Sequence, residues 1–259
     1  MMVKKEPNER LNDEHFLEVD AIVAEAKKAG VTHIINVGTS LQESCNAVDL
    51  ALRYKTVSAT LGIHPCDITE TWQRELTFLE SILLEDRDQK IVAIGETGLD
   101  YYHKPYDKVM QEEVFRAHIE LAITHDKPLV VHIRDAGDDA LAILSEYMPR
   151  GARGVVHCFS LDQEAADMLV SNSWLIGIDG PVTYKKNDAL RAIAATVPLE
   201  NILLETDAPF LTPQAFRGKR NTPGYLPLIA EQIALSRGVN VEEVARVTTQ
   251  NAQRLFNLI

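Results

Sequence analysis

Apolar runs of strand length recur along the chain, separated by stretches with helical periodicity. The runs begin near His33, Val57, Lys90, Pro128, Gly154, Ser173 and Asn201. Between two of them, in the segment from Asp107 to His125, apolar residues recur at steps of three and four, which is typical of a helix. The runs themselves are continuously apolar rather than alternating, which indicates strands buried on both faces, as in a parallel sheet.

This repeated alternation of strand and helix predicts an α/β fold, a closed TIM-type (β/α)8 barrel, with a doubly wound open sheet as the alternative. A chain of 259 residues suits such a barrel, and no linker divides it, so we expect one domain over residues 1–259. The first predicted helix, about Asp13 to Ala29, precedes the first good strand. The first barrel strand should therefore lie in residues 1–10, which are polar and contain Pro7, so we expect it to be degenerate or missing.

Composition narrows the class of protein. The chain is 46% hydrophobic, enough for a sizeable core, and its 38 acidic against 26 basic residues give a net charge of -12. Contact with nucleic acid would then need a local basic patch or bound cations. The three cysteines predict a reducing compartment rather than a disulfide framework. The first ten residues lack the apolar part of a secretory signal and no run reaches 18 apolar residues, so we expect a cytoplasmic protein without a membrane span.

Four of the strand runs end in residues that bind metals. Glu96, His132 and His157 each close one run, and Asp207 follows the run that begins at Asn201. In a barrel these positions lie at the C-terminal face, where barrel enzymes build their sites, and His64 belongs to the same rim. Carboxylate oxygens and imidazole nitrogens suit Mg, Mn or Zn. The four residues together predict a divalent-metal site.

Each of these residues also has a structural interpretation. A single histidine at a strand end is more often hydrogen-bonded within the fold than bound to metal, and only the set of four favours a metal site. Five histidines have no such placement and are interpreted as helix, loop or core residues: His15, His33, His103, His118 and His125. Cys158 follows His157 on the strand and should point the opposite way, into the core.

Several motifs resemble those of the TatD family of metal-dependent hydrolases and deoxyribonucleases, within the amidohydrolase-like barrel superfamily. The resemblance extends over nearly the whole chain from Leu11 onward. Its specific pieces are Gly62-Ile-His-Pro65, Gly95-Glu-Thr-Gly-Leu-Asp-Tyr-Tyr102, Val131-His-Ile-Arg134, His157-Cys-Phe-Ser160, Glu205-Thr-Asp-Ala-Pro-Phe-Leu-Thr-Pro213, Arg217-Gly-Lys-Arg-Asn-Thr-Pro223, and Asn251-Ala252 with Leu255-Phe256.

The resemblance implies a metal-dependent phosphodiesterase that acts on nucleic-acid ends, as an exonuclease. In the family pattern Glu96 would bridge two metal positions, and His132 and His157 would complete the second. Asp207 would hold the first metal and orient or deprotonate the attacking water, which makes Asp207 and Glu96 the predicted catalytic residues. The predicted cofactor is one or two divalent ions, Mg, Mn or Zn.

One departure falls in the missing strand. The family begins with a strand ending in His-x-His, and alignment on Leu11 puts Asn8 and Arg10 at the two histidine positions. Asn is a poor ligand for a transition metal, and the Arg guanidinium has no lone pair to donate. We therefore predict an incomplete first metal position and at most one tightly held ion. Either the site is altered, or the N-terminus is misassigned or truncated; we favour the second, since residues 1–10 also make a poor strand.

Basic residues near the predicted metal ligands are candidates for binding phosphate. Arg217, Lys219 and Arg220 form a compact cluster about ten residues past Asp207, interpreted either as a solvated loop or as a grip on phosphate. Arg134 is another phosphate candidate, unless it pairs with a nearby aspartate. Tyr101 and Tyr102 either stack on a base or pack in their loop. The predicted substrate-binding set is His64, Arg134, Arg217 and Arg220.

The leading hypothesis is thus a metal-dependent nuclease whose substrate is single-stranded DNA ends, with no membrane and no obligate protein partner. An amidohydrolase-type enzyme that cleaves a C–N or ester bond is the first alternative, because this barrel supports many chemistries. A catalytically weak relative that binds ligand without turnover is the second, motivated by Asn8 and Arg10.

Overall fold

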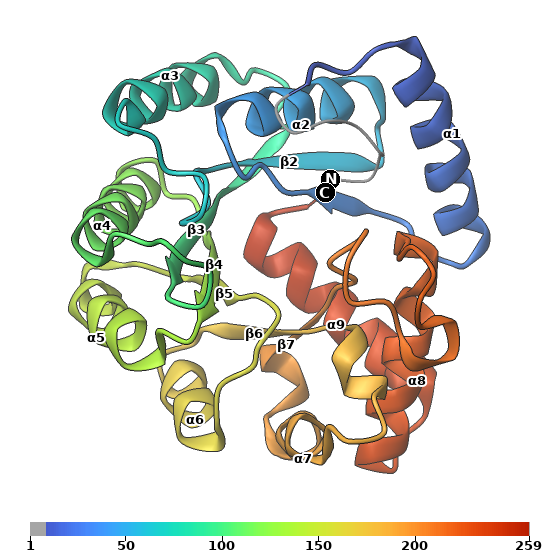
Figure 1. Ribbon diagram of the computed structural model, residues 1–259. Coiled ribbons are helices and arrows are strands. Elements are labelled where there is room, and N and C mark those ends of the chain that lie inside the picture. The colour runs from blue at the N-terminus through green and yellow to red at the C-terminus, as the bar shows by residue number, and fades with distance from the viewer. Residues whose placement is uncertain (1–8, 259) are drawn as a thin grey trace. The chain divides into compact units, whose positions relative to one another are not determined.

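The computed structural model describes residues 9–258, which divide into two units of chain (Figure 1). The first unit contains residues 33–155, and the second contains residues 11–32 together with residues 156–258. Each unit carries part of the predicted strand–helix alternation. We describe them separately.

The first unit is built on four parallel strands that pair in sequence order. They are β1 (Ile34–Asn36), β2 (Val57–Leu61), β3 (Ile91–Asp100) and β4 (Leu129–Arg134). The connecting helices are α2 (Leu41–Arg53), α3 (Trp72–Glu85), α4 (Lys108–Thr124) and α5 (Gly137–Tyr147). Helices α2, α4 and α5 pack on these strands (Figure 1), and every residue of β2 and β3 is buried. The continuous apolar runs are therefore explained by burial on both faces.

Strand β3 changes register against β4 between Ile94 and Thr97, and Glu96 lies within this irregularity. Such bulges re-aim side chains next to functional sites. The backbone N–H of Glu96 donates to the carbonyl oxygen of Gly38 at 2.7 Å. Past the irregularity the strands pair again, with Gly98 opposite His132. The prediction that β3 ends at Glu96 and β4 at His132 was wrong, because pairing resumes beyond both residues.

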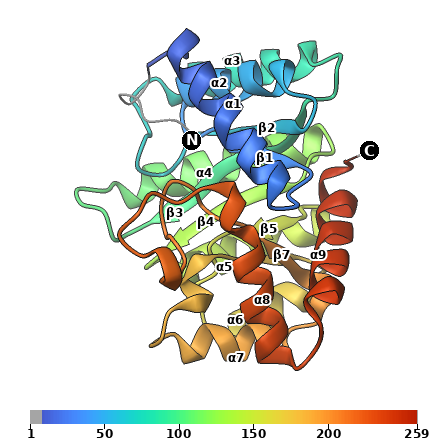
Figure 2. The same ribbon diagram turned by 90° about the vertical axis from the view of Figure 1, so that its right-hand side faces the viewer.

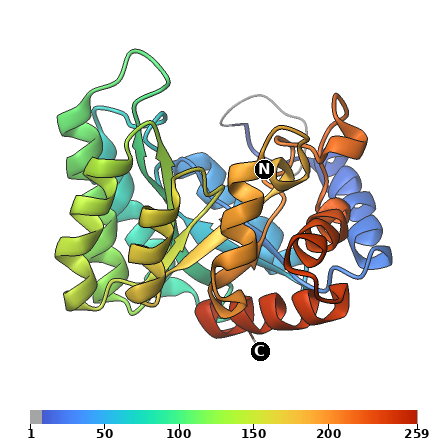
Figure 3. The same ribbon diagram turned by 90° about the horizontal axis from the view of Figure 1, so that it is seen from below.

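The second unit contains two parallel strands, β6 (Leu175–Ile178) and β7 (Ile202–Leu204). Its helices are α1 (Asp13–Lys28), α6 (Gln163–Ser171), α7 (Asp188–Thr196), α8 (Leu226–Arg237) and α9 (Val241–Phe256). Figure 2 shows α8 beside α9, and Figure 3 shows the same pair from below. Buried Asn251 ties α9 to the start of β7, because its amide donates to the carbonyl oxygens of Leu199 and Ile202, each at 2.8 Å.

The remaining strand is β5 (Gly154–Val156). The first unit ends within it, at Val155, and the second unit resumes at Val156. With β5, all seven predicted strand runs are confirmed within residues 9–258. The helices predicted near Asp13–Ala29 and Asp107–His125 are confirmed as α1 and α4. Asn12 caps α1, since its side chain accepts the N–H of His15 while its own N–H donates to the His15 ring.

The predicted first strand, residues 1–10, lies mostly outside the described residues. Of that segment only Glu9 and Arg10 are described, and both are exposed and outside any strand. Within residues 9–258, the helices are all too short or too polar to cross a membrane.

Candidate metal centre

Glu96 and His132 face each other in the first unit. Glu96 comes from the irregular part of β3 and His132 from β4, and Glu96 Oε1 lies 3.2 Å from His132 Nδ1. Gly98 makes this approach possible, because a β-carbon there would come within 2.0 Å of the His132 carbonyl oxygen. Glu96 is 8% exposed. A carboxylate so far from water needs a positively charged partner.

Asp100 holds the other side of the His132 ring, with its Oδ2 2.9 Å from His132 Nε2. Burial alone would raise the pKa of Asp100. Hydrogen bonds from the backbone and ring of His103 and from the ring of His132 outweigh burial, however, and the net pKa is lowered well below its ordinary value. Asp100 is therefore an ionised acceptor, so His132 Nε2 must carry the proton that is shared with it.

With a single proton, held on Nε2, the His132 ring presents a lone pair at Nδ1, toward the Glu96 carboxylate. Two acceptors 3.2 Å apart repel each other unless a cation or an added proton reduces the repulsion. A ring whose far nitrogen is held by a carboxylate is the usual arrangement of a metal-binding histidine. These residues therefore fit a divalent metal, and binding it would displace any proton held between Glu96 and His132.

His64 lies beside both Glu96 and His132. Its Nε2 is 3.5 Å from Glu96 Oε1, and its ring stands edge-on to that of His132 with centroids 4.4 Å apart. His64 Nδ1 accepts the backbone N–H of Cys66 at 3.1 Å. The proton of neutral His64 is thus on Nε2, pointing at the carboxylate. This geometry suits a donor that orients Glu96 or a bound ligand.

Arg134 contacts an aromatic ring. Its guanidinium carbon lies 4.0 Å from the centre of the Tyr102 ring, a cation–π contact. Both side chains are exposed at the end of β4 and the loop after β3. The contact leaves the N–H edge of the guanidinium suited to bind an anion.

In the second unit, His157, Cys158 and Glu205 come together. His157 Nδ1 lies 4.0 Å from Glu205 Oε1, and the backbone N–H of Cys158 donates to the same carboxylate. Gly177 on β6 makes room, because a β-carbon there would lie 2.5 Å from Glu205 Oε1. The prediction that Cys158 points into the core was wrong: the strand ends at Val156, Cys158 has a positive φ of 47°, and its side chain is half-buried.

Three carboxylates share this part of the second unit. Burial first, and then the charges of Glu205 and Asp207, raise the pKa of Asp179 to about 8. Burial also raises the pKa of Glu205. Asp179 is 2% exposed, and its Oδ2 has no hydrogen-bond partner among the described residues. Acids this closely grouped fit a bound divalent cation, which would favour their ionised forms.

Asp207 follows β7 by three residues and has a left-handed backbone with φ of 53°. The loop beyond it is held by buried Asn221, whose amide donates to the carbonyl oxygens of Thr206 and Phe210 at 2.5 and 2.6 Å. This loop keeps Phe210 outside the core, with 67% of its surface exposed.

The predicted basic cluster is divided in its contacts. The Arg217 guanidinium carbon lies 4.3 Å from the centre of the Tyr184 ring. Arg220 forms an ion pair with Glu18 of α1. The sequence separation between Arg220 and Glu18 explains why this pair escaped sequence analysis.

Three further acids, Asp100, Asp179 and Glu205, were not predicted as site residues. Their position at strand ends is the signal that could have identified them. Asp100 ends β3, Asp179 follows β6 and Glu205 follows β7, and the predicted ligands hold the same kind of position. What the sequence alone cannot show is the surroundings of each acid in the fold, which for Asp179 are burial and the neighbouring charges of Glu205 and Asp207.

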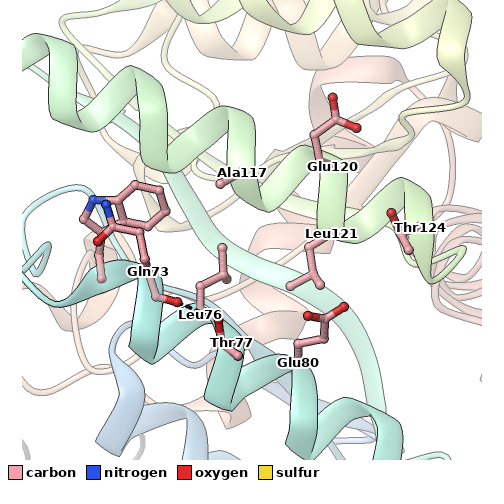
Figure 4. A pocket seen from close by; sticks show the side chains of 9 residues that line it. Gln73, Leu76, Thr77, Glu80, Ala117, Glu120, Leu121 and Thr124 are labelled. Carbon is pink, nitrogen blue, oxygen red and sulfur yellow. Dashed lines mark hydrogen bonds between the residues drawn. The ribbon is translucent and has the colours of Figure 1, made fainter.

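A shallow pocket elsewhere in the first unit lies between α3 and α4 (Figure 4). Glu80 and Glu120 contribute its carboxylates. Glu80 pairs with His125 at 2.8 Å, and Glu120 pairs with Arg150 at 2.7 Å. Both carboxylates thereby have basic side chains of the fold as partners, which distinguishes the pocket from the acid-rich candidate centre.

The fold elements and donor sets are those of a barrel hydrolase with carboxylate and imidazole metal ligands. Residues 10–257 match the family model described as TatD related DNase. The chain therefore belongs to the TatD family.

Among its relatives is the uncharacterized metal-dependent hydrolase YabD of Bacillus subtilis, 36% identical over 96% of both chains. Another, named a 3'-5' ssDNA/RNA exonuclease TatD, comes from Edwardsiella piscicida, with 36% identity over 93% of this chain and 94% of that protein. The crystal structure of YJJV, a TatD homologue from Escherichia coli, matches 96% of this chain and 95% of its own with a TM-score of 0.87 and 28% identity. This likeness confirms the predicted TIM-type barrel class.

Proposed function

We propose that this TatD-type hydrolase is a divalent-metal-dependent phosphodiesterase that releases nucleotides from the ends of single-stranded DNA. We further propose that residues 1–259 form one domain. Glu96 and His132 supply ligands from the first unit, and His157 and Asp207 supply them from the second. Family membership and the name of the Edwardsiella relative support the reaction class. The observation that carries the proposal is the close approach of the Glu96 carboxylate to His132 Nδ1, at 3.2 Å.

A bound divalent metal, Mg, Mn or Zn, would supply an activated water and offset the charge of the scissile phosphate. Asp207, an acid at a strand end, would accept a proton from the attacking water and orient it. Glu96 would fix the position of the centre, with His64 Nε2–H holding its carboxylate. His132 and His157 would stay neutral as ligands, because a protonated imidazole has no lone pair at the bound nitrogen.

The substrate would be held by exposed cations and aromatic rings. Arg134 and Arg217 each present a guanidinium stacked on a tyrosine, which suits recognition of phosphate by a planar fork. Phe210 and Tyr102, 67% and 54% exposed, offer faces on which unpaired bases can stack. Arg220 would contribute charge from its ion pair with Glu18.

The first metal position is proposed to be incomplete. Arg10 is described, exposed and unable to donate a lone pair; Asn8 lies outside the described residues. We therefore propose that one divalent ion per chain is held tightly. Cys45, Cys66 and Cys158 are thiols rather than disulfides, which agrees with a reducing, cytoplasmic setting.

A nuclease assay with an active-site control tests the proposed reaction. The protein is incubated with Mg²⁺ or Mn²⁺ and single-stranded DNA labelled at either end. We expect nucleotide release to fall by at least about 100-fold in Asp207→Asn, the size of effect typical of a lost general base. Asp188→Asn, an exposed acid at the start of α7, is the matched control and should keep full activity.

Two results would contradict the proposal. Equal nucleotide release by wild type and Asp207→Asn would assign the activity to another protein or another site. No release from DNA, together with turnover of an amide or carboxylic ester substrate, would favour the amidohydrolase-type alternative.

A further inference from the structure

Asp100 is hydrogen-bonded through both its backbone and its carboxylate, although it is not among the proposed metal ligands. It is fully buried at the end of β3. Gln111 of α4, 3% exposed, fixes its backbone at both ends: Asp100 N–H donates to Gln111 Oε1 at 2.9 Å, and Gln111 Nε2 donates to the Asp100 carbonyl oxygen at 3.0 Å. These two hydrogen bonds fix the backbone position from which the Asp100 side chain extends.

The Asp100 carboxylate accepts hydrogen bonds at both oxygens. Oδ1 accepts the backbone N–H groups of Tyr102 at 3.0 Å and His103 at 2.9 Å. Oδ2 lies 2.9 Å from both His103 Nδ1 and His132 Nε2. Four donors on one buried carboxylate use most of its lone pairs and leave it an acceptor only.

We propose that Asp100 is a positioning residue that keeps the His132 proton on Nε2 and so directs the Nδ1 lone pair at a divalent metal beside Glu96. The inference rests on the proposed metal site at Glu96 and His132, and not on the identity of the substrate. Its physical basis is that the hydrogen bond at one imidazole nitrogen sets the tautomer and raises the basicity of the other.

A direct-ligand role for Asp100 is the competing interpretation, because donor atoms of His64, Asp100 and His132 lie within 4.8 Å of one another. The hydrogen bonds argue against it. A metal at Oδ2 would have to replace the bonds from His103 and His132, and a metal at Oδ1 would displace two backbone N–H groups. A metal bound between His132 Nδ1 and the Glu96 carboxylate would displace none of these hydrogen bonds.

The tautomer of His132 is the direct readout. The protein is labelled with ¹⁵N-histidine and loaded with Zn²⁺, and ring nitrogens are assigned with the help of His132→Gln. We expect the proton on Nε2 and the metal-bound shift on Nδ1. The tautomer itself is read on the wild-type protein, and the variant serves only to assign the signals. A proton on Nδ1, or a metal-bound shift at Nε2, would overturn the inference.

Metal affinity is the second readout, measured by calorimetry with Zn²⁺. Asp100→Asn keeps the size of the side chain but offers an amide donor to Nε2, which drives the proton to Nδ1. We expect its dissociation constant to rise about 10- to 100-fold, as is usual when a carboxylate behind a metal-binding histidine is lost. Asp88→Asn, exposed in the loop before β3, controls for the lost charge and should bind Zn²⁺ as the wild type does.

His103→Gln separates positioning from general loosening of the Asp100 loop. It removes one ring bond to Asp100 but keeps the pair with His132, so its affinity and tautomer should match the wild type. An unchanged tautomer and affinity in Asp100→Asn would overturn the inference while leaving the metal site intact. A wild-type protein that binds no divalent metal would instead overturn the proposed function together with this inference.

Discussion

Gly98 on β3 lies directly opposite His132 on β4, so close that a methyl group on Gly98 would come within 2.0 Å of the His132 carbonyl oxygen. Its φ of 137° also lies in the region that side chains rarely adopt. The absence of a side chain at Gly98 is thus part of how the fold places His132 beside Glu96.

Gly98→Ala should therefore destabilise the protein by roughly 2–4 kcal/mol, through backbone strain and overpacking together. The measurement is urea unfolding. Gly151→Ala is the matched control, because Gly151 also has a positive φ, 98°, but nothing lies within 4 Å of its added β-carbon. That control should lose only about 1–2 kcal/mol. An equal loss of unfolding free energy in the two variants would show that the close approach of Gly98 to His132 does not contribute to the destabilisation.

His118 predicts a pH dependence of stability. It is fully buried, its Nε2 accepts the N–H of Ile63 at 3.1 Å, and burial lowers its pKa to about 4 from an ordinary 6.5. Between these values the unfolded chain binds the extra proton and the folded chain does not. This contribution to stability is complete above about pH 6.5 and is lost as pH falls toward 4, by up to about 3 kcal/mol.

The free energy of unfolding in urea is measured from about pH 6.5 to about pH 4 for wild type and for His118→Gln. The difference between the two proteins isolates the contribution of His118, because the opposing effect of Asp179, whose pKa is raised in the fold, is present in both. The difference between the two proteins should shrink as pH falls. His15→Gln is the control, because Gln can replace His15 in the cap of α1. A wild-type-to-His118→Gln difference that stays constant with pH would contradict the assignment of a buried neutral imidazole.

Phe210 gives a prediction for substrate binding. Its ring is 67% exposed on a loop fixed by Asn221. If a base stacks on it, Phe210→Ala should raise the KM for single-stranded DNA roughly 5- to 100-fold, as expected for one lost stacking contact, with little change in kcat. Phe78→Ala, which removes a ring 53% exposed on α3, should leave both constants unchanged. An unaltered KM in Phe210→Ala would remove Phe210 from the substrate site.

All seven strands could be predicted from the sequence because each is a short, continuously apolar run. Such a run is recognisable without knowing which strands it pairs with. The ends of β3 and β4 were misplaced, since the pairing of Gly98 with His132 beyond the irregularity at Glu96 depends on contacts between strands. Asp100 was also missed, because the role of that acid exists only through the rings of His103 and His132. Residue type and strand-end position are enough to suggest metal ligands. The residues that orient those ligands can be identified only from the three-dimensional structure.

The central claim is the proposal that one divalent ion is bound tightly per chain, with His132 and His157 both among its ligands, and metal titration tests it most directly. Mn²⁺ binding is measured by equilibrium dialysis for the wild type, His132→Gln from the first unit and His157→Gln from the second. We predict one tight ion per wild-type chain, and affinity at least about 10-fold weaker in both variants. Wild-type affinity retained by either variant, or two tightly held ions per chain, would contradict the account.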